Sequence, residues 1–310
     1  MTINKIYTDE NAAREHLEGL LWPDGPFCPH CGNSDPERIH KLQGKSTRPG
    51  VYKCRECEKP FSVTVGTVFE ASHVPLHKWV YAVHLLTASK KGISSHQLMR
   101  MLGVSYKTAW FMSHRIREGM RPAKLEPMGG TGKIVEIDET LQGRIEEAPT
   151  FVKRGQHFNW RNTVLALVER GGSARSFHVQ DATMATLLPI IRTNVRRESA
   201  LMTDELSAYK KLGDEFESHQ AVNHSAKEYV RGDATTNTVE GYFSIFKRGM
   251  KGIYQHCSEK HLHRYLSEFD FRYSNRVALG VDDAERAEKA LQGITGKRLT
   301  YRRPRKAYVN

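Results

Sequence analysis

Four of the five cysteines form two Cys-x-x-Cys pairs, an arrangement that could bind a metal ion. The pairs are Cys28-Pro-His-Cys31 and Cys54-Arg-Glu-Cys57, with 22 residues between them. Each pair presents two thiolates, and four thiolates complete the tetrahedral coordination of Zn²⁺. Disulfides or a redox-active pair are weaker explanations, since the two pairs have the spacing of a zinc ribbon. We therefore expect Cys28, Cys31, Cys54 and Cys57 to hold one structural zinc ion, and Cys257 to be an ordinary thiol.

Three acidic residues lie where the expected secondary structure surrounds them with apolar residues. Asp138 falls within the strand-like run Ile134–Leu141, Asp204 directly follows the run Ala200–Thr203, and Glu240 falls in a long helical stretch. A charged residue in an apolar strand is costly unless it is paired or binds a metal. We expect the three carboxylates to converge and to hold two Mg²⁺ ions that contact both sides of a phosphodiester. The alternative is solvated surface carboxylates, which we expect for some of Glu136, Glu139 and Glu205.

One face of the helix that contains Glu240 is predicted to hold further functional side chains. Lys247 lies on this face, so we expect it near the metal ions. Lys247, together with Arg248, could bind the phosphate of a substrate strand or offset the negative charge of the acids. The spacing i, i+3, i+7 and i+10 places four residues on this face: Asn237, Glu240, Ser244 and Lys247.

The elements that must position these acids form an α/β pattern. Three adjacent strands are followed by alternating helices and strands, which indicates a mixed sheet flanked by helices. Ribonuclease-H-like nucleotidyl-transfer domains use the same order. The predicted elements are strands at Ile134–Leu141, Thr163–Glu169 and Arg175–Gln180, a helix at Thr183–Arg196, a strand at Ala200–Thr203, a short helix at Glu205–Leu212, a strand at Ser218–Val222 and a long helix at Asn237–Lys251.

The segment from Gly92 to Arg117 has the pattern of a helix–turn–helix. Ser94 or Ser95 can cap a helix through Leu102, Gly103 makes a turn, and Ser105 can cap a second helix from about Tyr106 to Gly119. In this geometry the start of the second helix faces the major groove of DNA. The alternative is a small helical linker with a solvated basic face. The predicted DNA contacts are Lys107 and Thr108 at the helix start, with Arg115 and Arg117 nearer the DNA backbone or the packing face.

The charge distribution favours a polyanionic partner. The 310 residues include 47 Lys and Arg and 35 Asp and Glu, for a net charge of +12. Residues Ser72–Met128 contribute +7 and Lys297–Asn310 contribute +6, so the rest of the chain is nearly neutral. Two basic segments on a neutral body indicate localised contacts with phosphate. A mean hydropathy of −0.57 and the lack of a ~20-residue apolar run exclude a membrane-spanning protein, and we expect a folded cytoplasmic protein.

Composition changes divide the chain into four predicted segments. Pro122, Pro127 and several glycines cluster in Arg121–Lys133, which predicts a boundary there. The basic end, Gly296–Asn310, could grip DNA or merely increase solubility. The segments are a zinc ribbon with an N-terminal helix over residues 1–70, a helix–turn–helix region over 71–128, a ribonuclease-H-like catalytic domain over 129–280, and a basic C-terminal tail over 281–310.

Taken in order, these motifs resemble the ISXO-type insertion-sequence transposases, bacterial relatives of the eukaryotic Merlin transposases. The resemblance covers roughly Glu10 to Arg276. Each motif is weak alone, but their order is specific. The matching segments are Cys28-Pro-His-Cys31-Gly32, Cys54-Arg-Glu-Cys57, Gly92-Ile-Ser94, Gly103-Val-Ser-Tyr-Lys-Thr-Ala-Trp110, His114-Arg-Ile-Arg117, Val135-Glu-Ile-Asp-Glu-Thr140, Asp204, Asn237-Thr-Val-Glu-Gly-Tyr-Phe-Ser244, Lys247-Arg248 and Glu268-Phe-Asp-Phe-Arg-Tyr273.

The resemblance implies a DDE catalytic site in which Asp138, Asp204 and Glu240 bind Mg²⁺ or Mn²⁺ and Lys247 completes the pattern. Some members have Asn in place of the third acid, whereas this chain keeps Glu240. His224 also matches a family position, where it could touch the active site or DNA or be a structural histidine. The implied activity is metal-dependent cleavage and transfer of DNA strands at the terminal inverted repeats of an insertion sequence.

The implied partners are double-stranded DNA, as element ends and as target, and further copies of the chain in a homodimer or higher assembly. The implied location is the bacterial cytoplasm, in association with the nucleoid. Two alternatives remain open. A domesticated DNA-binding regulator would use the zinc ribbon and the helix–turn–helix without catalysis, and a ribonuclease-H-like nuclease would cleave without strand transfer.

Overall fold

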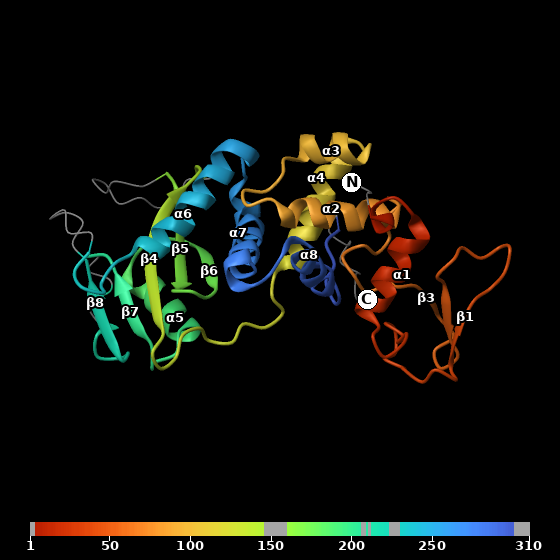
Figure 1. Ribbon diagram of the computed structural model, residues 1–310, viewed down its shortest axis with the longest axis horizontal. Coiled ribbons are helices and arrows are strands. Elements are labelled where there is room, and N and C mark those ends of the chain that lie inside the picture. The colour runs from red at the N-terminus through yellow and green to blue at the C-terminus, as the bar shows by residue number, and fades with distance from the viewer. Residues whose placement is uncertain (1–3, 146–159, 206–208, 210–211, 223–229, 301–310) are drawn as a thin grey trace, which may run out of the picture. The chain divides into compact units, whose positions relative to one another are not determined.

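The computed structural model describes residues 4–145, 160–205, 209, 212–222 and 230–300. The chain forms two compact units (Figure 1). The first unit combines Met1–Ser89, Ile93–Arg121 and Asp283–Asn310, and the second combines Lys90–Gly92 with Pro122–Asp282. The predicted ribbon and most of the predicted helix–turn–helix segment therefore belong to one unit, while Lys90–Gly92 and residues 122–128 belong to the other. Within the described ranges, no helix is both long and apolar enough to cross a membrane.

The ribbon is a small antiparallel sheet that packs against one aromatic cluster. Trp22 lies edge-on to Tyr52 and Phe61, with ring centroids 5.4 and 5.9 Å away. Ile39, Tyr52 and Phe61 lie in the strands of this sheet. The elements are α1 (Glu10–Leu21), capped by Asp9, and β1 (Ile39–Lys41), β2 (Tyr52–Cys54) and β3 (Pro60–Phe61) in the order β1-β2-β3.

The helix–turn–helix elements form where the capping residues predict them. The Ser94 side chain accepts a hydrogen bond from the backbone N–H of Gln97, and the Ser105 side chain accepts one from Thr108. Gly103 ends the first of these helices at φ +60°, a left-handed conformation that glycine adopts without strain. The helices are α2 (Leu76–Ala88), α3 (Ser95–Leu102) and α4 (Tyr106–Met120).

The C-terminal segment differs from the predicted basic tail. Asp283–Gln292 form a helix, α8, which packs against α2 and α4 of the first unit. Its buried residues are Arg286, Ala287, Ala290 and Leu291, and Arg286 donates a hydrogen bond to the Thr87 carbonyl oxygen. The helix forms because the apolar residues Ala287, Ala290 and Leu291 recur at helical spacing. The basic charge of the segment comes later, and its last residues, 301–310, lie outside the described part of the chain.

The second unit is built on a five-stranded mixed sheet of ribonuclease-H-like topology. The strand order is β6-β5-β4-β7-β8. The first three strands in sequence pair antiparallel, and the last two add in parallel to the other side of β4. This confirms the predicted fold class. The strands are β4 (Ile134–Gln142), β5 (Asn162–Glu169), β6 (Ala174–Val179), β7 (Ala200–Thr203) and β8 (Ser218–Ala221).

Helices cover both faces of this sheet. The alternation of side chains along the strands sends Val135 and Ile137 toward α5 (Met184–Asn194), in a core that includes Leu187 and Ile191. Val164 and Ala166 face the other core, which contains side chains of α6 (Asn237–Gly249) and α7 (Glu259–Ser274). A π-helical turn over Met250–Tyr254 follows α6. Most of the short helix predicted over Glu205–Leu212 lies outside the described residues.

Candidate functional site

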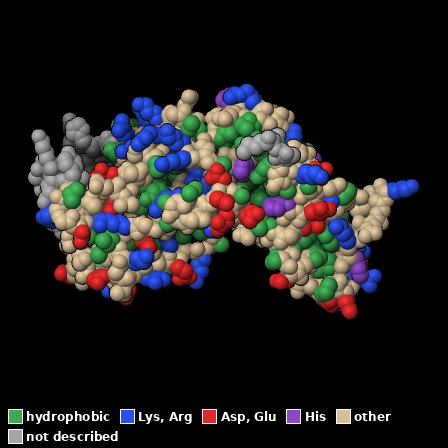
Figure 2. Space-filling view, viewed as in Figure 1, with side chains coloured by type: hydrophobic (Ala, Val, Ile, Leu, Met, Phe, Trp, Pro, Cys, Tyr) green, Lys and Arg blue, Asp and Glu red, His purple; other side chains and the backbone are tan. Residues whose placement is uncertain are grey.

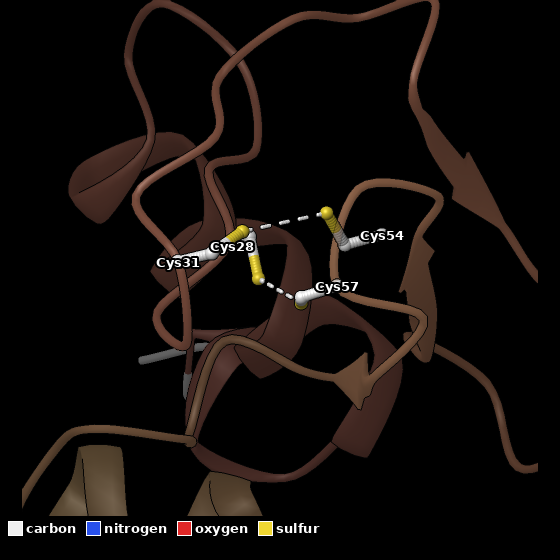
Figure 3. A group of neighbouring side chains, drawn as sticks. All are labelled: Cys28, Cys31, Cys54 and Cys57. Carbon is white, nitrogen blue, oxygen red and sulfur yellow. Dashed lines mark hydrogen bonds between the residues drawn. The ribbon is translucent and has the colours of Figure 1, made fainter.

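The four paired cysteines meet in the ribbon, although 22 residues separate the pairs. Their sulfur atoms all lie within 4.8 Å of one another. Cys28 and Cys57 are 3.6 Å apart, and Cys31 and Cys54 are 3.7 Å apart; Figure 3 shows the four side chains converging. A disulfide would require about 2.05 Å between sulfurs. Four thiolates around a tetrahedral zinc, with Zn–S bonds of about 2.3 Å, lie about 3.8 Å from one another.

The cysteine cluster therefore fits a zinc ion in both ligand type and spacing. A backbone hydrogen bond from Cys57 lowers the pKa of the Cys54 thiol to about 7, which favours the thiolate that binds zinc. The Asn33 side-chain amide also donates to the Cys54 sulfur, at 3.6 Å. Cys28 and Cys54 are buried in the ribbon core, so a bound zinc ion would hold this small sheet together.

A second candidate metal centre lies where β4 and β7 diverge. The parallel register pairs Glu136 with Met202. Continued by two residues on both strands, the same register would bring Asp138 opposite Asp204. Asp138, Asp204 and Glu139 each offer a carboxylate oxygen, and these three oxygens lie within 4.8 Å of one another. The structure thus brings together two of the three predicted acids. It adds Glu139, which sequence reasoning had grouped with surface carboxylates.

The electrostatics of this acidic cluster favour a bound cation. Burial and the nearby charges of Glu139 and Asp204 raise the pKa of Asp138 to about 8. Burial also raises the pKa of Glu139, whose carboxylate accepts a 2.5 Å hydrogen bond from the Tyr209 hydroxyl. Carboxylates held this close repel one another unless a proton or a cation lies between them. Oxygen ligands of this kind suit Mg²⁺ or Mn²⁺.

Glu240 lies beside this cluster but is not one of the residues whose carboxylate oxygens lie within 4.8 Å of one another. Its side chain is exposed on α6, and its carboxylate accepts a 2.8 Å hydrogen bond from the Thr236 hydroxyl. Its charge is one of those that raise the pKa of Asp138, so the two carboxylates interact electrostatically. Lys247 is also exposed on α6, and so is Arg248, which donates to the Ser244 hydroxyl.

A buried carboxylate that sequence reasoning had not selected joins β4 to α6. Glu136 is fully buried and accepts hydrogen bonds from the backbone N–H groups of Thr238 and Val239, at 2.7 and 3.0 Å. Arg170 donates to the same carboxylate at 2.6 Å and to the backbone oxygens of Asp233 and Thr235. The sequence signal that could have identified Glu136 is its apolar neighbours on β4. They indicate that this acid is buried, and a buried acid needs partners.

Arg115 and Arg117 were predicted to contact DNA, but both side chains are buried. Arg117 is 1% exposed and donates to the Ser113 hydroxyl, and Arg115 is 6% exposed and donates to the Glu70 carbonyl oxygen. The Arg115 guanidinium also lies 5.3 Å from the Trp79 ring centre. These arginines stabilise the packing of α4 within its own unit and are not available to DNA. Lys107 is exposed and Thr108 half-buried at the start of α4.

The remaining candidate, His224, lies outside the described residues. No further His, Cys, Asp or Glu groups that could hold a metal ion occur in the part of the chain that the structure describes.

Two family comparisons match most of the chain. Residues 8–60 match a transposase zinc-ribbon domain, and residues 129–274 match the ISXO2-like transposase domain. A Halobacterium salinarum protein named for the transposable element ISH50 is 29% identical over 281 residues, which cover 86% of this chain and 92% of that protein. A transposase-like protein of Haemophilus influenzae is 30% identical over 97 residues, covering 31% of this chain and 77% of the relative.

Loose structural similarities were also found. A Mos1 strand transfer complex matches with a TM-score of 0.29 and 13% identity, covering 68% of this chain and 73% of that one. A pre-cleavage Mos1 transpososome matches with a TM-score of 0.26 and 12% identity, covering 68% and 74%.

Proposed function

Because the chain belongs to the family of ISXO2-like transposases, we propose that it cuts and joins DNA at the ends of an insertion sequence. The observation that supports this best is the meeting of Asp138, on the central strand β4, and Asp204, directly after the neighbouring strand β7, in a ribonuclease-H-like sheet. These residues, with Glu139 and Glu240 beside them, would hold Mg²⁺ or Mn²⁺. Bound there, the metal supplies an activated oxygen nucleophile and neutralises charge on the phosphodiester.

The chemistry proceeds in two in-line displacements. In the first, water attacks the phosphorus at the element end, the bond to the 3′ oxygen breaks, and a 3′-hydroxyl is released. In the second, this 3′-hydroxyl attacks a phosphodiester of the target DNA, and a 3′ oxygen of the target leaves. The exposed Lys247 and Arg248 of α6 bind the phosphates of the reacting strand.

The first unit provides recognition of the terminal inverted repeats. Lys107 and Thr108, at the start of α4, reach into the major groove, and the zinc ribbon adds contacts. Two element ends must be joined to one target, so the active form is a homodimer or a larger assembly on DNA. The enzyme works on the chromosome, at the nucleoid of the bacterial cytoplasm.

Asn substitutions at the acidic cluster test this function. A duplex that carries the end of the element is incubated with Mn²⁺, and nicking and transfer into a plasmid are measured separately. Asp138→Asn and Asp204→Asn should each lower nicking by about 10³-fold, which corresponds to several kcal/mol of transition-state stabilisation. Both variants should still bind the duplex. Asp214→Asn, an exposed acid of the same unit, serves as the matched control.

Three outcomes would contradict the proposal. Normal nicking by Asp204→Asn would remove the catalytic assignment. Binding without nicking by the wild type would favour a DNA-binding regulator. Nicking without transfer of the labelled end would favour a nuclease that lacks the joining step.

A further inference from the structure

A cavity of about 410 Å³ opens at the far end of the β4–β5 hairpin. Its size falls in the range of small-ligand sites. It is lined by the end of β4, the start of β5 and the turn that follows α6. Among its described lining residues, Arg144 carries a full charge and no carboxylate is present. The lining residues that bear on its function are Arg144, Trp160, Asn162, Gln255 and His256.

Trp160 gives the cavity an accessible aromatic surface. Its side chain is 44% exposed, although a large apolar ring is usually covered in a monomer. The Arg144 guanidinium lies 5.7 Å from the ring centre, within the range of a cation–π contact. A hydrogen bond from the Ile145 N–H to the Trp160 carbonyl oxygen holds the two segments together. An exposed ring beside a guanidinium is the arrangement on which unpaired bases stack.

Polar groups line the same cavity. Asn162 is 3% exposed, and its side chain donates to the Arg144 carbonyl oxygen and pairs with His178. Gln255 adopts φ +59°, a strained conformation for a residue other than glycine, and the next residue, His256, is exposed. Such strain is often retained at binding sites. Gln255 and His256 therefore offer hydrogen-bonding groups at the cavity wall.

The cavity lies on the same sheet face as the acidic cluster. Gln142 lines it, and Gln142 is four residues beyond Asp138 on β4, so both side chains point to the same face. Four residues of strand span about 14 Å. α6 runs beside β4 over this stretch, because Glu136 contacts its first turn and Met250, just past its end, lines the cavity.

Basic side chains extend along this stretch. Lys247, Arg248 and Lys251 are exposed on α6 and the turn after it, and Arg144 and Arg161 are exposed on the hairpin. Figure 2 shows Lys and Arg side chains gathered over the region where Figure 1 draws α6 and the end of β4. A DNA strand that leaves the acidic cluster along α6 would meet these positive charges before it reaches Trp160.

We propose that this cavity binds the base of an unpaired nucleotide that lies within about four nucleotides of the cleaved phosphate, by stacking on Trp160. The limit of four nucleotides follows from the length of β4 between Asp138 and Gln142, about 14 Å, and a spacing of about 3.4 Å per stacked nucleotide. The inference rests on the proposed transposase function, since it assumes that the cleaved strand enters at Asp138. An unpaired base held here would keep the end of the duplex open at the site of cleavage.

The first experiment measures binding of fluorescein-labelled oligothymidylate to the full-length protein without divalent metal. Trp160→Ala should weaken binding by about tenfold or more, because stacking on an aromatic ring contributes substantially per base. Trp160→Phe keeps an aromatic face and should retain most of the affinity. Val277→Ala, a change at an exposed apolar residue elsewhere on the same unit, should bind like the wild type.

The second experiment places 2-aminopurine at successive positions of the element-end duplex. With wild-type protein, fluorescence should change at one position within about four nucleotides of the cleaved phosphate, and Trp160→Ala should abolish the change. Nicking of the same duplex is measured in parallel. Unaltered oligothymidylate binding by Trp160→Ala would overturn the inference. If Trp160→Ala weakens oligothymidylate binding but the wild-type protein nicks no DNA, the result would support nucleotide binding in the cavity and contradict the proposed function.

Discussion

Glu136 accepts two hydrogen bonds from Thr238, one from its backbone N–H at 2.7 Å and one from its hydroxyl at 2.8 Å. The N-cap residue of α6, Thr236, makes no side-chain cap bond of its own. A carboxylate on β4 therefore satisfies the first turn of α6 in place of a local cap. Asp138 lies two residues after Glu136, and Glu240 lies two residues after Thr238. This contact thus fixes the spacing between the strand and the helix that contribute the acidic residues.

Glu136→Gln should disturb the acidic site without removing a metal ligand. The amide keeps one acceptor oxygen but loses the charge that pairs with Arg170. We expect the Mn²⁺ concentration for half-maximal nicking to rise by about 10- to 100-fold, the usual effect of losing a group that orients a ligand. Metal-free binding of the duplex should not change.

Glu215→Gln is the matched control for Glu136→Gln, because Glu215 forms an ion pair with Arg192 on the surface of the same unit. It should leave the metal requirement unchanged. Equal metal requirements for wild type and Glu136→Gln would show that Glu136 has a structural role alone.

Cys54→Ser should lower the zinc content of the purified protein below one ion per chain. Loss of zinc removes the interaction that holds the small ribbon sheet. Trp22 packs on Tyr52 and Phe61 in the ribbon, so its fluorescence should change as the ribbon unfolds. Cys257→Ser alters a thiol outside the cluster and should keep the zinc. Full zinc retention by Cys54→Ser would contradict the four-thiolate site.

Asp270→Asn should remove a pH-dependent part of the folding free energy. Burial raises the pKa of Asp270 to about 7, although Tyr242 and Ser176 donate hydrogen bonds to its carboxylate. The folded state therefore binds this proton more tightly than the unfolded state, and the free energy of unfolding falls between about pH 4 and pH 7. The contribution is up to about 4 kcal/mol.

Urea denaturation at several pH values measures this contribution. The unfolding free energy of the wild type, measured relative to that of Asp270→Asn, should fall by up to about 4 kcal/mol as the pH rises across this interval, because the neutral amide does not ionise. Asp214→Asn, at an exposed position, should follow the wild type. A difference in unfolding free energy between wild type and Asp270→Asn that does not change with pH would contradict the raised pKa of Asp270.

Lys107→Ala and Arg117→Ala should separate DNA binding from folding. Lys107 is exposed, so its loss should weaken duplex binding by about 1–3 kcal/mol without lowering Tm. Arg117 is buried, and its loss should destabilise the protein by about 2 kcal/mol or more. Thermal denaturation and fluorescence anisotropy on the same samples check both. A normal Tm with weakened binding for Arg117→Ala would restore the original assignment.

Local patterns predicted the elements of the fold well. The strand-like runs of the sequence located all five strands of the mixed sheet, and the capping serines located α3 and α4. The helix α8 was missed, because its Ala-rich stripe is short and adjoins a strongly basic segment. The sequence left open whether Arg115 and Arg117 face the DNA backbone or the packing side of the helix, since a basic residue on a helix gives no local sign of which side the next helix will cover.

The sequence by itself determined the types of side chains available for chemistry and the order of the secondary structure. It established the four thiolates, and it placed Asp138 in a strand and Asp204 at the end of another. The tertiary structure alone decided which carboxylates meet. Glu139 joins Asp138 and Asp204, Glu240 lies just outside, and Glu136 is fully buried at the start of α6. The physical reason is that strand register and helix docking set these distances, and both depend on packing between segments more than 60 residues apart in sequence.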